Sequence, residues 1–139
     1  MFKSLFVTLL AAMTTGVATA APWPLEIIDH LDDATLVIYA NESDIESSPR
    51  WSPAKGAPPF GLTALFKAVG DWKKQNHYAE ADGIEKVELK PIARHEKEGR
   101  WYYLVQLKDL EDDGHAHRYL AVLMNGKTIA AVKEPEAYK

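Results

Sequence analysis

Residues 101–107, Trp-Tyr-Tyr-Leu-Val-Gln-Leu, constrain the fold of this chain more than any other segment. This run of aromatic and β-branched residues predicts a strand. Because side chains alternate along a strand, Trp101 and Tyr103 share one face, whereas Tyr102 and Leu104 share the other. Neither face is wholly polar. Both faces of the sheet that holds this strand must therefore be covered.

Further strand patterns on either side of this run predict a four-stranded antiparallel meander. They span residues 84–93, 117–124 and 127–133. Pro91 cannot donate to a sheet ladder, which predicts an edge strand or a bulge in the first of them. Asn125-Gly126 predicts a two-residue type I′ hairpin turn between the last two.

Residues 60–75 carry the helical signal of the chain. Apolar residues recur there at spacings of three and four, the period of a helix that buries one stripe. They are Leu62, Leu65, Phe66, Val69 and Trp72. The pattern predicts one main helix, preceded by Pro58-Pro59, that docks on one face of the sheet. The fold class is therefore α+β.

Two short apolar runs precede the helix, at residues 25–28 and 35–39. The second predicts a strand, and the first is either a strand or a short helix, so an additional N-terminal hairpin or short helix is expected. Residues 41–59, rich in Ser and Pro, predict a loop that Trp51 anchors to the core. The N-terminal hairpin, this loop or another subunit must cover the second face of the sheet.

Residues 1–20 have the pattern of a secretory signal peptide. Lys3 supplies a basic start, Leu5 to Leu10 open an apolar core, and Ala18-Thr19-Ala20 is a small-residue cleavage site. The expected mature chain, residues 21–139, forms a single domain that is released into the periplasm or secreted without a membrane anchor. The chain has no cysteine, which excludes a disulfide framework and a thiol nucleophile.

The charge pattern excludes one class of partner. The formal net charge is −4 at pH 7, and the chain has no basic run. Nucleic-acid binding needs clustered Lys and Arg side chains to neutralise phosphates. Nucleic acid is therefore not an expected partner, and an anionic membrane surface is disfavoured for the same reason.

The helix followed by a four-stranded meander resembles the cystatin-like arrangement. Pro58-Pro59 before the helix, Trp101-Tyr102-Tyr103 at the start of a central strand and residues 122–127 at a hairpin resemble the small secreted PepSY-like domains of bacteria. The resemblance covers residues 49–133. It implies a cell-envelope domain that binds partners or restrains peptidases.

The segment from Glu111 to His117 contains the one local cluster with metal-ligand chemistry. If His115 and His117 are extended, both imidazoles lie on one face, and Asp113 or Asp112 supplies an oxygen. Such a set could hold zinc or copper(II), with water completing the shell. The alternative is a charged hairpin turn without metal, because Asp-Asp-Gly is ordinary turn chemistry.

The aromatic residues Trp101, Tyr102 and Tyr119 are the candidate partner surface. They support a non-catalytic binding domain that engages a protein, a peptide or a second copy through the exposed side of its sheet. A metal-binding protein using His115 and His117 is the second hypothesis, and no other cofactor is expected. A small cone-fold enzyme, with Asp71, His95, Tyr102 or Tyr103 as proton-transfer groups, is the third, because no spacing in the chain selects these residues. A serine hydrolase is not expected, since no serine has the G-x-S-x-G context of a nucleophile.

Overall fold

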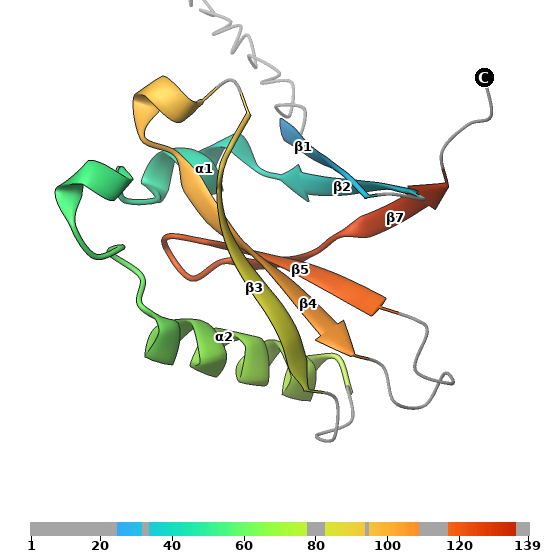
Figure 1. Cartoon of the computed structure of the whole chain (residues 1–139). Helices are drawn as coiled ribbons and strands as arrows, with labels where there is room; N and C mark the ends of the chain where they lie inside the picture. Colours follow the sequence, from blue (N-terminus) through green and yellow to red (C-terminus); the bar gives the residue numbers. More distant parts are fainter. Residues whose placement is uncertain (1–24, 32–33, 78–82, 94, 109–116, 136–139) are drawn as a thin grey trace, which may run out of the picture.

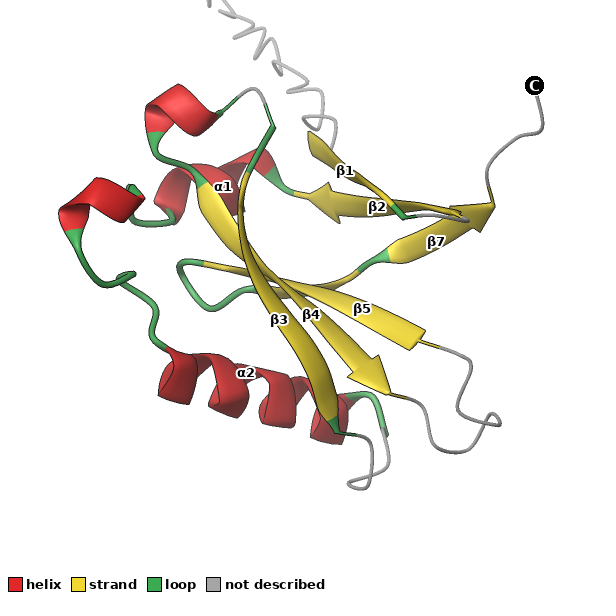
Figure 2. Ribbon diagram, viewed as in Figure 1, coloured by secondary structure: helices red, strands yellow, loops and turns green. Residues whose placement is uncertain are grey.

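The computed structural model describes residues 25–31, 34–77, 83–93, 95–108 and 117–135 (Figure 1). The chain is α+β, with one main helix and two antiparallel sheets (Figure 2). The strands are β1 (Leu25–His30), β2 (Ala34–Ala40), β3 (Ile84–Pro91), β4 (Trp101–Lys108), β5 (His117–Leu123), β6 (Thr128–Ala130) and β7 (Val132–Pro135). The helices are α1 (Glu42–Ser47) and α2 (Leu62–Gln75), with short 3₁₀ turns at Pro53–Lys55 and Glu96–Glu98.

The four-stranded sheet has the order β3-β4-β5-β6, and β4 pairs along its length with both neighbours. Helix α2 covers one face of this sheet (Figure 1). Leu65 and Val69 of α2 are buried there against Tyr103 and Val105 of β4. Trp101, Tyr103, Val105 and Leu107, which alternate along one face of β4, all belong to this apolar cluster, so theirs is the face that α2 covers.

The second face of the four-stranded sheet is covered by the other sheet, which has the order β1-β2-β7. Leu36 and Ile38 of β2 are fully buried in one cluster with Tyr102 and Leu104 of β4. Burial of this apolar surface is the main source of stability for a chain without disulfides. Both faces of β4 are therefore covered by this chain itself.

The apolar stripe of α2 is only partly used in packing. Leu65 and Val69 are buried, but Leu62 and Phe66 are 55% and 50% exposed. The expectation that the whole stripe docks on the sheet is wrong for these two residues. The helix contacts the sheet along a narrower face than the sequence pattern indicates.

The chain changes sheets near Ala131, where one continuous strand over 127–133 is predicted. Residues 128–130 form β6 beside β5, whereas residues 132–135 form β7 beside β2. The amide of Ala131 still donates to the carbonyl of Tyr119, at 2.9 Å, before the chain leaves the four-stranded sheet. Passage of one segment from sheet to sheet ties the two layers together.

The turn at Asn125-Gly126 differs from the predicted type I′. Both central residues of that turn need positive φ, but Gly126 has φ +88° and Asn125 is not in the left-handed region. Gly126 donates its amide to the carbonyl of Leu123, and Leu123 donates to Lys127. These bonds define a three-residue loop that ends in a left-handed glycine.

Residues 41–59 contain a helix that the sequence pattern does not predict. Helix α1 has six residues, of which Ile45 is buried. The expected anchor of this segment is confirmed, because Trp51 is 6% exposed and packs edge-on against Trp101 with ring centroids 5.4 Å apart. The Trp51 indole also donates to the carbonyl of Gly56, at 3.1 Å.

Gly70 lies inside α2, with nothing within 4 Å of the position that a Cβ would occupy. Gly70→Ala should therefore raise the free energy of unfolding by about 0.5–1 kcal/mol, because alanine loses less backbone entropy in a helix. Urea unfolding followed by circular dichroism measures the change. A Gly70→Ala variant less stable than the wild type would show that the added methyl group meets neighbouring atoms, contrary to the structure.

Candidate functional site

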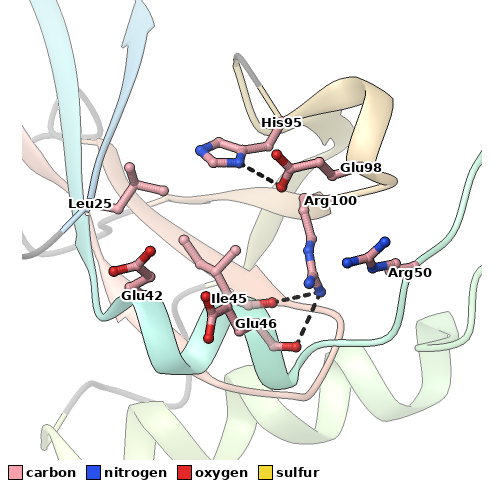
Figure 3. Close-up of a pocket in the computed structure, with 8 residues that line it drawn as sticks. All are labelled: Leu25, Glu42, Ile45, Glu46, Arg50, His95, Glu98 and Arg100. Carbon is pink, nitrogen blue, oxygen red and sulfur yellow. Dashed lines mark hydrogen bonds and ion pairs between the residues drawn. The ribbon is translucent and has the colours of Figure 1, made fainter.

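A cleft lies between α1 and the connection from β3 to β4 (Figure 3). Its volume is about 710 Å³, within the range of small-molecule sites. Its lining combines charged groups of both signs with two aliphatic side chains. The residues are Leu25, Glu42, Ile45, Glu46, Arg50, His95, Glu98 and Arg100.

Arg100 fixes the two walls of this cleft to each other. Arg100 is buried, and its Nη1 donates to the carbonyls of Ile45 at 2.9 Å and Glu46 at 3.3 Å (Figure 3). Nη1 also donates to the carbonyl of Ser48, at 2.7 Å. These carbonyls lie at and just beyond the C-terminal end of α1, where a helix leaves acceptors without partners. A cation there satisfies the carbonyls and complements the helix dipole.

His95 and Glu98 form a hydrogen-bonded pair on the other wall of the cleft. Nδ1 of His95 donates to Oε2 of Glu98, at 3.0 Å. This hydrogen bond is the main cause that lowers the pKa of the Glu98 carboxyl, and the nearby Arg100 and Arg50 guanidinium groups add to it. Glu98 and Arg100 already form hydrogen bonds within the fold. A ligand in the cleft would therefore bind mainly to the exposed side chains at its rim.

A different surface presents apolar groups to the outside. The face of the three-stranded sheet that points away from the core carries Ile28 of β1, Tyr39 of β2 and Val132 of β7, which are 48%, 43% and 46% exposed. Val37 lies between Ile28 and Val132, because it pairs with Ile28 on one side and with Val132 on the other. Val37 itself is only 5% exposed, so Ile28, Tyr39 and Val132 are the exposed members of this group. We call Ile28, Val37, Tyr39 and Val132 the outer apolar face.

The sequence predicts a partner surface of Trp101, Tyr102 and Tyr119, but the structure does not place these residues on one exposed face. Tyr102 is only 2% exposed and belongs to the core between the two sheets. Burial, together with the carboxylates of Asp29 and Glu88, raises the pKa of its phenol. Trp101 packs with the cluster under α2, on the opposite side of the sheet from Tyr102 and Tyr119.

The expectation that one side of the four-stranded sheet is an exposed interface is therefore wrong, because strands β1 and β2 cover that side. The outer apolar face was not identified from the sequence. The alternation of β2 contains the signal, because Tyr39 follows the inward-facing Ile38. Which of the two sheets holds the exposed face depends on packing between residues distant in sequence.

The expected metal ligands cannot be placed. Asp112, Asp113 and His115 lie outside the described residues, as does the side chain of His117. Within the described ranges, no group of three or more His, Cys, Asp or Glu side chains could hold a metal ion. Zinc or copper binding by His115 and His117 stays a prediction.

The architecture defines the class of this protein as a small α+β domain with one main helix and two antiparallel sheets. In the part of the chain that the structure describes, no helix is long and apolar enough to cross a membrane. No protein-family model, curated protein or solved structure matches the chain. The function of the chain is therefore inferred from the cleft beside α1 and from the outer apolar face.

Proposed function

We propose that this chain is an exported, non-catalytic binding protein that engages a protein partner through the outer apolar face. One observation carries the proposal: three large apolar side chains from neighbouring strands, Ile28, Tyr39 and Val132, are each nearly half exposed. Contiguous exposed apolar groups on a folded domain mark interaction sites, and tyrosine is enriched in them.

The periphery of this face supports a protein partner. The alternate residues of β1 place Glu26 and His30 on either side of Ile28, and β7 places Glu134 beyond Val132. An apolar centre with a polar rim is the arrangement found in protein interfaces. The signal pattern of residues 1–20 supports a location in the periplasm or outside the cell.

We also propose that the chain has a cystatin-like fold of the kind found in PepSY-like domains. Support comes from the order of the elements, because α2 is followed by β3, β4, β5 and β6, which pair in the order of the chain. Under this proposal, β1, β2 and β7 are an addition that provides the binding face.

Capture from an envelope extract with matched variants tests this function. Tyr39→Ser combined with Val132→Ser should reduce retention of the partner by about tenfold or more, because both apolar anchors are lost. Leu62→Ser combined with Phe66→Ser is the control, since these residues are equally exposed but belong to α2. Retention is measured by quantitative mass spectrometry.

Equal retention by the two double variants would contradict the outer apolar face as the site. A wild-type chain that retains no protein above the level of an unrelated domain would contradict the binding function itself. Circular dichroism spectra of both variants should match the wild type, because all four substituted side chains are exposed.

A further inference from the structure

The edges of the two sheets differ in how well they are protected against pairing with another chain. Edge strands of soluble proteins normally carry bulges, prolines, lysines or very short lengths that prevent such pairing. Strand β3 has an irregularity between Ile84 and Lys86 and ends at Pro91. Strand β6 has three residues, and β7 has four, including Lys133 and Pro135.

Strand β1 has no bulge, proline or lysine and is not short, and its one inward-pointing charge, Asp29, is paired with Lys90 of β3. It contains six residues, Leu-Glu-Ile-Ile-Asp-His, with no proline and no lysine, and it pairs with β2 in an uninterrupted register from Leu25 to His30. It lies at the end of the three-stranded sheet opposite to β7 (Figure 1). Among the described residues, no strand pairs with its other edge.

The faces of β1 restrict which strand can pair with it. Ile27 is buried in the core, whereas Glu26, Ile28 and His30 are exposed on the outer side. In an antiparallel pair, residues that lie opposite each other point to the same face of the sheet. A second copy of β1 can therefore align only in registers that place outer residues opposite outer residues.

We propose that β1 pairs antiparallel with β1 of a second copy, about a two-fold axis at Ile28. This register places Glu26 opposite His30 of the second copy, twice by symmetry, and Ile28 opposite its own counterpart. A carboxylate opposite an imidazole is favourable, whether the imidazole is charged or donates a neutral N–H bond.

The neighbouring registers are less favourable. Centring the axis on Asp29 places two Asp29 carboxylates opposite each other, and like charges in that position destabilise a sheet. Centring it on Ile27 places Glu26 opposite Ile28 and loses the pairing with His30. Lys90 of β3 pairs with Asp29 within each subunit in every register and reduces the repulsion between the two Asp29 carboxylates, so the two Glu26–His30 pairs are the main reason to favour the Ile28 register.

The pairing joins the two three-stranded sheets into one continuous sheet. The row Ile28, Val37 and Val132 then meets the same row of the second copy at the axis. The inference extends the proposed function, because the outer apolar face becomes a surface shared by two copies. It does not depend on that function, since the hydrogen-bonding edge of β1 and the Glu26–His30 pairs define the pairing without any other partner.

Analytical ultracentrifugation and light scattering of the mature chain from Ala21, over a series of concentrations, test the pairing. The wild type should dimerise. Glu26→Lys and His30→Glu should each raise the dimer dissociation constant by about tenfold, because Glu26→Lys removes the carboxylate that faces His30 and His30→Glu places two carboxylates opposite each other. The double variant Glu26→Lys/His30→Glu should recover affinity near the wild-type value, because it restores opposite charges.

Glu134→Lys is the matched control, since it makes the same charge change on the same face but on β7. It should leave dimerisation unchanged. A wild type that stays monomeric into the high micromolar range would overturn the inference, as would a double variant no better than the single ones. A dimer weakened by Tyr39→Ser/Val132→Ser but not by Glu26→Lys would assign self-association to the outer apolar face and overturn pairing through the edge.

Discussion

Replacement of Arg100 by Ala should lower the free energy of unfolding by about 3 kcal/mol. Arg100 is 7% exposed, and its guanidinium group donates to the carbonyls of Ile45, Glu46 and Ser48. Hydrogen bonds from a charged donor are worth about 1.5–3 kcal/mol, and removal of the donor takes a bond from each of the three carbonyls, of which that of Ile45 keeps the bond from the Ser48 amide. Equilibrium unfolding in urea measures the loss.

Arg50→Ala is the control for this prediction, because Arg50 lines the same cleft but is exposed. It should change stability by less than about 0.5 kcal/mol. Arg100→Lys should recover only part of the loss, because an ammonium group cannot reproduce the planar geometry of guanidinium. Equal stabilities of Arg100→Ala and Arg50→Ala would show that Arg100 does not hold α1 in place.

Gly99→Ala should cost about 2–3 kcal/mol. Gly99 has φ +69°, and a Cβ there would lie 3.0 Å from the carbonyl oxygen and 3.2 Å from the amide nitrogen of Trp51. Those atoms are backbone and are held in place, since the Trp51 amide donates to the carbonyl of Gly99 at 3.0 Å. The left-handed conformation and the close contact add to each other.

Gly126→Ala separates the two contributions. Gly126 also has positive φ, but its Cβ would meet only the ring of Phe60, at 3.2 and 3.3 Å. A side-chain ring moves more readily than backbone, so we expect a loss of about 1 kcal/mol, close to the conformational term alone. Thermal unfolding compares the two variants, and a larger loss for Gly126→Ala would contradict the argument.

The sequence predicts those parts of the fold that depend on local periodicity. The strand at 101–107 and the helix at 60–75 are observed within two residues of the expected bounds, at Trp101–Lys108 and Leu62–Gln75. Their apolar patterns are long and regular, so single residues that disfavour the element, such as Gly70 in the helix, do not change the prediction. The edge position expected of the strand containing Pro91 is also confirmed.

The missed elements depend on distant contacts. Helix α1 is too short to be stable alone, and a guanidinium more than fifty residues further along the chain satisfies its last carbonyls. The division of residues 127–133 between two sheets depends on the position of β2, to which β7 pairs. A periodic pattern in one segment contains no information about either partner.

The candidate site likewise has one part that local sequence predicts and one part that distant contacts decide. The sequence indicates that a strand with two apolar faces needs two covering layers, and the structure provides both. Once β1 and β2 cover Tyr102, the exposed apolar residues are those on the far side of these strands, Ile28 and Tyr39. The site therefore depends on which layer is outermost, which is a property of the assembled fold.

The pairing of β2 with β7 has a consequence for how the chain acquires its structure. Ala34 lies opposite Pro135, so the three-stranded sheet closes only after nearly the whole chain is available. Contacts between residues so far apart in sequence form slowly, because a long loop must be closed first. For the exported chain that we propose, this order is useful: transport machinery that threads unfolded polypeptide would meet a protein whose three-stranded sheet cannot be completed until residues 132–135 are available to pair with β2.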